Sequence, residues 1–231
     1  MCRNAPERSP ICPNPRLLIE RSYNNGQNVQ VTTTAPSPAF RRAEPDARRL
    51  SLIEACARVL AASGAAGASV RAIAQEAGVS PGLVGHYFGA VDALVAATYE
   101  YVDGKVAEAL DEAVANAGPG PRARLEAFVT ASFAPPIADP ALLATWIAFW
   151  SLVTARADIA RQHDEQYAGY RARLETLLGD CGVAPQARRR QAIAVTALVD
   201  GLWLELCLSP GCFSAEDARD IARSFLASII S

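Results

Sequence analysis

The feature that most constrains the fold is an eleven-residue stretch, residues 78–88, that reads GVSPGLVGHYF. It holds three glycines and a proline, yet the segments on either side, SVRAIAQEA and VDALVAATYEYV, have the apolar spacing of amphipathic helices. Glycine costs about 1 kcal/mol and proline about 3 kcal/mol in a helix interior. The stretch therefore predicts a tight turn and a short helix whose glycines allow close approach to another surface.

The spacing around this turn is that of a helix-turn-helix. Ala74 and Gly78 are four residues apart, so a small side chain lets the next helix cross closely, and Gly78 supplies the left-handed turn. Ser80 is predicted to cap the next helix and Pro81 to take its first position, where a missing N–H costs nothing. Such a helix enters the DNA major groove, which predicts DNA binding. A helical hairpin whose glycines serve packing alone is the competing interpretation.

The chain from residue 46 onward has a helical pattern. Apolar residues recur three and four positions apart, and no alternating run of β-branched residues stands between turn clusters. The first helix is expected to stop at Gly64, Ser69 to cap the second, and Val91 to begin a long fourth helix. Five more helices follow the GPGP linker at 118–121. The predicted fold class is all-α with about nine helices, a three-helix front and a larger helical rear.

Composition separates the two ends of the chain. Residues 1–45 hold seven of the fifteen prolines and show no periodicity, so they are predicted to form a flexible N-terminal extension. Residues 1–90 carry ten arginines against six acids, whereas residues 91–231 carry twelve basic against eighteen acidic residues. A cationic front suits a part of the protein that meets a polyanion.

Histidine and cysteine usage argues against an enzyme or a metal site. His86 and His163 are the only histidines, and neither lies in a nucleophile or metal-ligand pattern; the six cysteines show no metal spacing either. We therefore predict no catalytic activity, no metal and no cofactor. No apolar signal sequence opens the chain, and the longest apolar run, 141–153, is too short to cross a bilayer. These features predict a cytoplasmic protein with no membrane partner.

Residues 69–94, SVRAIAQEAGVSPGLVGHYFGAVDAL, preceded by RRLSLIEACARVLAASG, resemble the DNA-binding domain of the tetracycline-repressor (TetR) family. The ending HYF, with WIAFW and ALVDGLWLE further on, is most similar to the choline-responsive BetI branch. The resemblance implies an all-α dimer in which residues 46–106 bind DNA and residues 107–231 hold a ligand pocket and the dimer interface. It also implies a repressor that a small-molecule effector releases from a palindromic double-stranded operator, since a dimer supplies two-fold symmetry. The alternative is a protein-interaction module whose helix-turn-helix no longer binds specific DNA.

Two positions depart from the pattern of the family. Its members usually have an aromatic residue where Gly85 stands and a lysine where Val91 stands, and both commonly touch phosphates. Their absence shifts the expected contacts to Tyr87, to His86 and to an arginine pair in the first helix, although His86 could equally be a solvated capping residue. Leu83 is expected to meet thymine methyl groups. The candidate DNA-contacting residues are Arg48, Arg49, Ser69, Val70, Ser80, Pro81, Gly82, Leu83, Gly85, His86 and Tyr87.

All three tryptophans lie behind residue 145. Trp146, Phe149 and Trp150 share one helical face, a pattern typical of either a packed core or a pocket wall. Asp200 lies in the apolar run AIAVTALVDGLWLELCL, where an unpaired carboxylate would be costly. A partner arginine, a capping contact or a cationic ligand held between aromatic faces would each account for it. The candidate pocket residues are Trp146, Phe149, Trp150, Tyr167, Tyr170, Asp200 and Trp203.

The last two predicted helices have more apolar surface than one chain needs to cover. The final helix carries a single apolar stripe, and the helix before it is apolar nearly all round. A second subunit is the economical cover for such surface at a chain end, which predicts a homodimer. The candidate interface residues are Leu202, Leu206, Ala218, Ile221, Ala222, Phe225, Leu226 and Ile229.

Overall fold

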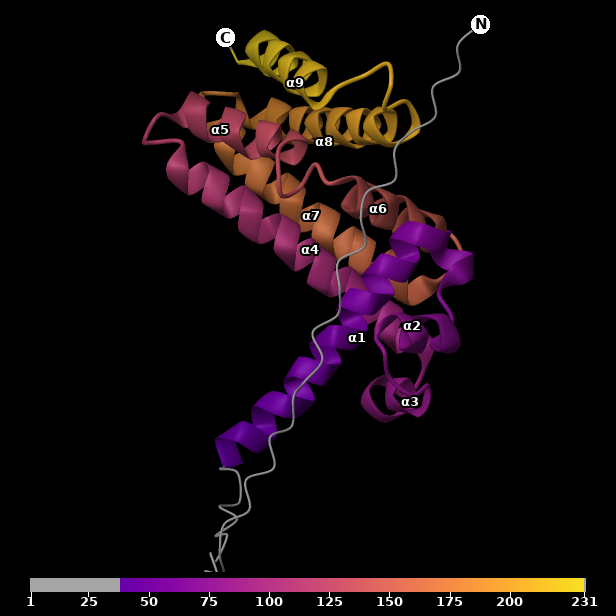
Figure 1. The fold of residues 1–231 in the computed structure, drawn as a ribbon. Helices are drawn as coiled ribbons and strands as arrows, with labels where there is room; N and C mark the ends of the chain where they lie inside the picture. Colours follow the sequence, from indigo (N-terminus) through magenta and orange to yellow (C-terminus); the bar gives the residue numbers. More distant parts are fainter. Residues whose placement is uncertain (1–37, 231) are drawn as a thin grey trace, which may run out of the picture. The chain divides into compact units, whose positions relative to one another are not determined.

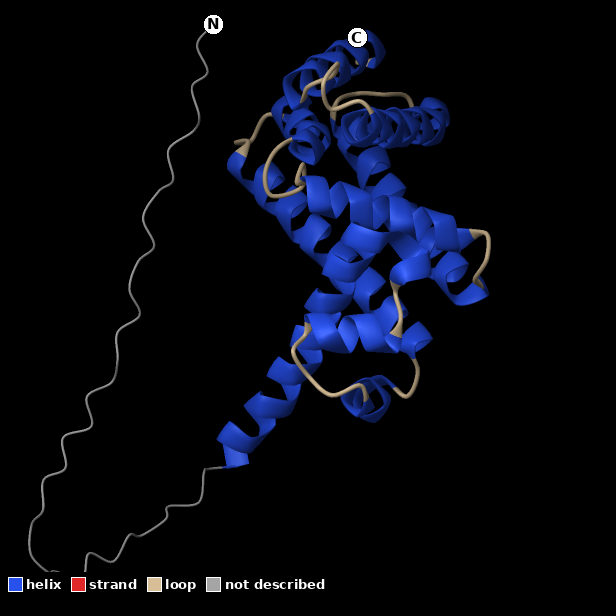
Figure 2. Cartoon of the chain, turned by 45° about the vertical axis from the view of Figure 1, so that its right-hand side comes forward, coloured by secondary structure: helices blue, strands red, loops and turns tan. Residues whose placement is uncertain are grey.

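A computed structural model describes residues 38–230 of the chain, with side chains from Pro45 onward. The described residues form nine α-helices and one short 3-10 helix, and no strand occurs among them (Figures 1 and 2). This confirms the predicted all-α fold class. The elements are α1 (Pro38–Gly67), α2 (Val70–Glu76), α3 (Gly82–Phe88), α4 (Val91–Asn116), α5 (Pro121–Thr130), η1 (Ala131–Phe133), α6 (Pro140–Val153), α7 (Ala157–Asp180), α8 (Pro185–Leu208) and α9 (Ala215–Ile229).

Helix α1 starts earlier than the sequence predicts. It begins at Pro38, so residues 38–45 are helical although they were expected in the flexible extension; the rest of that extension, 1–37, lies outside the described residues. Near its other end, Gly64 has φ 64° and ψ −173°, a conformation that breaks the helix into two segments. The break falls at the residue where the sequence predicts the first helix to stop.

The turn between α2 and α3 forms as predicted, but the start of α3 differs. The Ser69 hydroxyl accepts a hydrogen bond from the Ala72 N–H at 3.2 Å and so caps α2. Gly78 has φ 67°, the left-handed conformation that favours glycine. The N-cap of α3 is Pro81, with no side-chain cap hydrogen bond, so Ser80 is not the capping residue that the sequence predicts.

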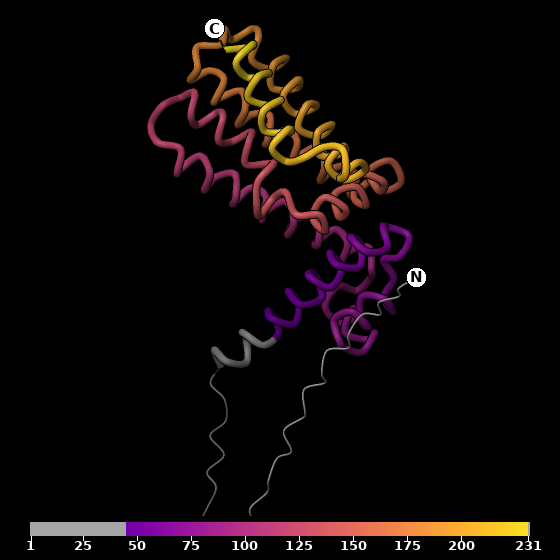
Figure 3. The backbone as a smooth tube through the Cα atoms, turned by 45° about the horizontal axis from the view of Figure 1, so that its top comes forward, coloured from indigo at the N-terminus to yellow at the C-terminus, as the bar shows by residue number. Residues whose placement is uncertain are grey.

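Helices α4 to α9 build the rear of the described chain. Helix α4 contacts α1 and α3 as well as α5 and α7, and α6 packs on α1, α7 and α8. Figures 1 and 3 place α9 beside α8, at the end of the bundle away from α2 and α3. The core includes Tyr99, Phe128, Phe133 and Phe149, each of which is almost completely buried.

Two helices are long and apolar enough to cross a membrane by length and composition alone. They are Pro45–Gly67 and Pro185–Leu208, and α6 with α7 would make a third span only if their 119° bend were counted within one segment. From the sequence, only the run 141–153 was considered as a membrane span, so neither of these helices was identified. In the structure α1 packs on α2, α4 and α6, and α8 packs on α6, α7 and α9.

Candidate functional site

Helix α3 presents an open outward face. Val84 is completely buried and anchors the helix, whereas His86 is exposed and packs edge-on against the Tyr87 ring at 4.9 Å. A Cβ atom placed on Gly82 or Gly85 would meet nothing within 4 Å, so this face has room for a close-fitting surface. The predicted contact residues on or beside α3, all exposed or half-buried, are Ser80, Pro81, Gly82, Leu83, Gly85, His86 and Tyr87.

The other four predicted DNA contacts lie on α1 and at the start of α2. Arg48 and Arg49 are exposed, and the Arg49 guanidinium lies 5.0 Å from the centre of the Phe88 ring, which joins α1 to the end of α3. Ser69 is exposed and acts as the cap of α2. Val70 is half-buried against the core, so less of its surface is available to a partner.

A cavity lies among α4, α6, α7 and α8. The volume that the centre of a water molecule can reach inside it is about 70 Å³. One water molecule needs about 10–15 Å³ of volume measured in this way. The cavity therefore has room for a small compact molecule of about five to seven non-hydrogen atoms. It is lined by Asp103, Val106, Leu110, Ser132, Trp146, Trp150, Gln166, Tyr167, Tyr170, Thr196, Val199, Asp200 and Trp203.

Six of the seven predicted pocket residues line this cavity, and Phe149 does not. Phe149 is completely buried and packs against the rings of Tyr99, at 4.7 Å, and Trp146, at 5.9 Å. Trp146 and Trp150 are one helical turn apart and both line the cavity, while Phe149 faces α4 instead. Phe149 is therefore a core residue, and its assignment to the pocket lining is wrong.

Asp103 lines the cavity but is not among the residues predicted from the sequence. Its signal was present, because Asp103, Val106 and Leu110 follow helical spacing and all line the cavity from α4. An acid that shares a helix face with apolar residues indicates a cavity, and Asp200 on α8 is a second example. The other missed polar lining residues, Ser132, Gln166 and Thr196, are of types common on any helix, so no sequence pattern marks them as part of a cavity.

Both carboxyl groups of the cavity are shifted toward the protonated form. Burial raises the pKa of Asp200 to about 6, although a hydrogen bond from the Tyr167 hydroxyl at 3.1 Å and the charge of Arg171 act in the opposite direction. Burial also raises the pKa of Asp103 to about 6. Within the described part of the chain, no cationic side chain lines the cavity.

Two polar groups of the lining have no hydrogen-bond partner among the described residues, the indole N–H of Trp146 and the side-chain oxygen of Gln166. The Tyr170 hydroxyl lies beside Ser132, and it keeps lone pairs that can accept a hydrogen bond. By contrast, the Trp203 indole N–H donates to the Ser132 carbonyl at 2.9 Å. Buried polar groups are nearly always paired, so the cavity is suited to a polar occupant.

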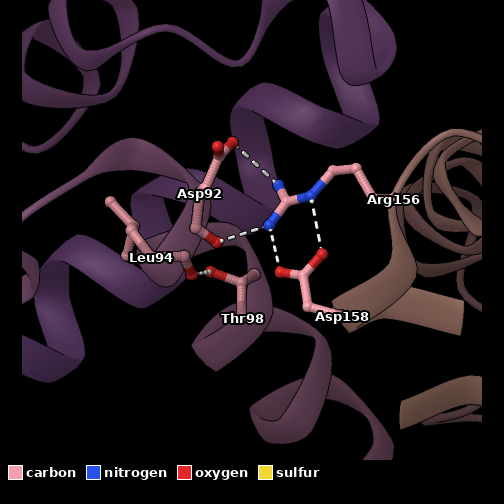
Figure 4. A network of polar contacts seen from close by, with 5 residues as sticks. All are labelled: Asp92, Leu94, Thr98, Arg156 and Asp158. Carbon is pink, nitrogen blue, oxygen red and sulfur yellow. Dashed lines mark hydrogen bonds and ion pairs between the residues drawn. The ribbon is translucent and has the colours of Figure 1, made fainter. Parts of the chain in front are cut away.

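A polar network ties the rear helices to the start of α4 (Figure 4). Arg156, just before α7, bonds to both the carboxylate and the backbone carbonyl of Asp92, each at 3.0 Å, and pairs with the carboxylate of Asp158. Nearby on α4, the Thr98 hydroxyl donates to the Leu94 carbonyl at 2.7 Å. Because Gly89 ends α3 and Val91 begins α4, this network lies close in sequence to the exposed α3 unit.

The predicted interface residues divide into two groups. Leu202, Ala218, Ala222 and Leu226 are buried within the single chain, so a second subunit cannot cover them in this conformation. These four are corrected to core residues, because the apolar stripe of α9 faces its own chain and Leu202 lies on the buried side of α8. Ile221 is 42% exposed, and the remaining predicted residues, Leu206, Phe225 and Ile229, are half-buried.

Comparisons with known proteins connect both parts of the chain to transcriptional regulators. Residues 52–98 match the tetR family of bacterial regulatory proteins, and residues 121–231 match the C-terminal domain of BetI-type transcriptional repressors. The HTH-type transcriptional regulators BetI of Burkholderia thailandensis and of Paraburkholderia phytofirmans are each 35% identical over 181 residues. In both cases 78% of this chain and 91% of the relative are covered.

Solved structures agree with this assignment. A putative transcriptional regulator from Pseudomonas aeruginosa PAO1 is 42% identical, with a TM-score of 0.73, covering 83% of this chain and 94% of that one. A putative regulator from Saccharomonospora viridis, solved in complex with choline, shares the fold at 20% identity, with a TM-score of 0.68 and coverage of 79% and 96%. The chain belongs to the tetR family of DNA-binding transcriptional regulators and carries a C-terminal domain of the BetI type.

Proposed function

We propose that the protein is a dimeric repressor that binds a palindromic operator and is released when a small organic cation enters the cavity. The observation that carries this proposal is the composition of the cavity, where tryptophan and tyrosine rings line the same space as the Asp200 carboxylate. Cations bind favourably over such rings, and a nearby carboxylate supplies the counter-charge. The complex of the S. viridis regulator with choline supports a cation of this kind.

The DNA-binding surface in this proposal is the open face of α3 with the arginines of α1. Gly82, Gly85 and His86 would lie against the groove, while Arg49 and Tyr87 would contact phosphates. Phosphate contacts position the protein, and contacts to base edges give sequence specificity. In this proposal the DNA-binding domain spans residues 46–106 and the ligand-binding and dimerisation domain spans residues 107–231.

The dimer in this proposal forms through exposed apolar residues of α8 and α9, which we call the α8–α9 face. It consists of Ile193, Leu204, Leu208 and Ile221, which are 45, 37, 71 and 42% exposed. Exposed Ala197 and Gly201 fall between Ile193 and Leu204 on α8, so the face is smooth enough for a second helix to pack closely. Phe225, one helical turn after Ile221 on α9, is half-buried. Three of the four defining residues lie outside the interface that the sequence predicts.

We also propose that the protein has no catalytic activity and that it acts in the cytoplasm. The relatives reported above are transcriptional regulators, which supports a protein without catalytic activity. A regulator that binds chromosomal DNA acts in the bacterial cytoplasm.

The experiment that tests this proposal measures operator binding with and without a ligand. The full-length protein is titrated against DNA from its own promoter region, and choline and betaine aldehyde are then added, first to the wild type and then to Asp200→Asn. We expect a sequence-specific shift that weakens as salt increases and that ligand reverses in the wild type. A shift that the cations leave unchanged would contradict the effector part, and the absence of any specific shift would favour an interaction module.

A further inference from the structure

The cavity carries two carboxylates from different helices. Asp103 comes from α4 and Asp200 from α8, and both line the same space. Burial raises the pKa of the Tyr99 hydroxyl, and the charges of Asp103 and Asp200 raise it further, so both carboxylates lie within electrostatic reach of one group. Two acids facing one small cavity are more than a single positive charge can compensate.

The protein itself supplies little compensation to these acids. Asp103 forms no ion pair or hydrogen bond with any described side chain, and burial is the cause of its raised pKa. Arg171 acts on Asp200 through its charge, but it lies 5.4 Å from the centre of the Tyr167 ring and is not part of the lining. Both carboxylates therefore depend on the occupant of the cavity for counter-charge.

Unpaired polar groups give a second, independent indication of a ligand. Trp146 is 5% exposed, lines the cavity, and its indole N–H has no partner. The Gln166 oxygen and the Tyr170 hydroxyl also line the cavity and can each accept a hydrogen bond. A protonated primary amine has three N–H donors for such acceptors, whereas a quaternary ammonium has none. The indole N–H needs a hydrogen-bond acceptor, which a water molecule entering with the ligand would supply.

We propose that the cavity takes a short dication with two protonated amino groups, one held by Asp200 and the other by Asp103. This inference rests on the proposed function, because it names the chemical class of the effector for the same cavity. A chain of about four carbons between the amines suits a space for five to seven non-hydrogen atoms. Tyr167, which donates to Asp200, then orients the carboxylate that receives one end.

Isothermal titration calorimetry of the full-length protein tests this proposal with three probes. They are 1,4-diaminobutane, 1-aminobutane and choline, titrated at pH 7.5, where both amines are charged. We expect the diamine to bind the wild type at least about tenfold more tightly than the monoamine, because only the diamine compensates both acids. Asp103→Asn should reduce this preference to about twofold or less.

Two further variants make the outcome specific. Asp200→Asn should also abolish the preference for the diamine, whereas Asp164→Asn, which removes an exposed acid outside the cavity lining, should leave it unchanged. Circular dichroism spectra and unfolding curves establish that each variant is folded before titration. The proposal is overturned if the monoamine or choline binds the wild type as tightly as the diamine, or if Asp103→Asn keeps the preference.

The outcomes separate this inference from the proposed function. If choline binds and releases operator DNA while the diamine has no advantage, the dication is wrong and the cation-responsive repressor stands. If none of the three probes binds, both the dication and the small-cation effector fail. DNA binding without ligand is measured in parallel and depends on neither result.

Discussion

Arg156 and Asp92 join the two functional parts of the chain. The Arg156 guanidinium donates to the Asp92 carboxylate and to the Asp92 carbonyl, both at 3.0 Å, from a side chain that is only 17% exposed. Asp92 lies in the first turn of α4, directly after the exposed α3 unit, and Arg156 lies between α6 and α7, which both line the cavity. If a ligand in the cavity shifts α7, as the proposed function requires, this contact would carry the shift directly to the start of α4.

Replacement of Arg156 by alanine should weaken the link between cavity and DNA. We expect a loss of about 1–2 kcal/mol in the free energy of unfolding, since several charge-assisted hydrogen bonds are lost from a mostly buried side chain. Operator DNA should then be released less completely at saturating ligand. Urea unfolding and DNA titration with and without ligand measure the two effects.

Arg223→Ala is the matched control for this variant. Arg223 also bridges two acids, Glu126 and Asp220, at 2.8 and 3.0 Å, but its side chain is 47% exposed and belongs to α9. Exposed ion pairs contribute little to stability, so we expect the free energy of unfolding to fall by less than about 0.5 kcal/mol. The ligand response should be unchanged. Equal effects of the two variants on ligand-induced release would rule out a specific role for Arg156.

Replacing Arg48 and Arg49 together by alanine should weaken binding to all DNA sequences. Lost phosphate contacts reduce both the affinity and the slope of log affinity against log salt, by about one unit of slope for each contact. Electrophoretic shifts at several salt concentrations, on operator and on unrelated DNA, measure both quantities. Arg122 and Arg124, on α5, form the control pair, and an unchanged slope in the Arg48 and Arg49 variant would exclude them as phosphate contacts.

Glutamate at Leu204 or Ile193 should dissociate the dimer without unfolding the subunit. Both residues are exposed in the single chain, so a charge there is solvated in the monomer and buried only in the dimer. Sedimentation velocity should show monomers, and Leu50→Glu, at an equally exposed apolar residue on α1, should remain dimeric. Leu226 is 3% exposed, so Leu226→Glu should instead destabilise the fold by several kcal/mol.

The two cavity acids should make the folded state less stable as pH rises. Their pKa values of about 6 in the fold exceed the ordinary value near 4, so the folded chain binds more protons than the unfolded chain between about pH 4 and pH 6. Stability from these groups is thus present below about pH 4 and lost as pH rises to about 6. Tyr99, Tyr167, Tyr170 and Arg171 are the other titratable groups near these acids.

Asp200→Asn isolates this effect, because asparagine resembles the protonated acid. Without ligand, the variant should be more stable than the wild type at pH 7.5, and the difference should vanish near pH 4. Urea unfolding at several pH values gives the difference directly, and Asp164→Asn, at an exposed acid, is the control. A difference that does not depend on pH would show that burial of Asp200 is not the cause.

Most of the fold was predictable because its signals are local. Ser69 caps α2, Gly78 adopts the left-handed turn and Gly64 breaks α1, and each follows from the conformational preferences of a single residue. The early start of α1 was missed because proline content was taken as a sign of flexibility. Pro38 instead stands at the start of the helix, where proline is well tolerated.

The candidate site could be predicted best at residues whose type is unusual for their surroundings in the sequence. Asp200 and the tryptophans stand out in the sequence. The helical spacing of Asp103 with Val106 and Leu110 is a weaker signal, and only the fold shows that this face of α4 meets the cavity. Phe149 and Trp150 stand three and four positions after Trp146, and the sequence cannot tell which of the two faces the cavity. That depends on how α6 packs against its neighbours, which is why Phe149 was wrongly assigned to the pocket lining. On α9 the apolar stripe identifies buried residues but cannot tell which chain buries them.

The open space around Gly85 has a consequence for how the DNA affinity of such a regulator can be changed. Apart from its two chain neighbours and the backbone of α3, a Cβ atom added there would meet no atom within 4 Å, and Gly85 is exposed in the middle of α3. In the proposed function, a side chain at Gly85 would change the surface that α3 offers to DNA, and the fold would change only by the gain in helix propensity, about 1 kcal/mol. Such a substitution leaves the hydrophobic core and the lining of the cavity as they are.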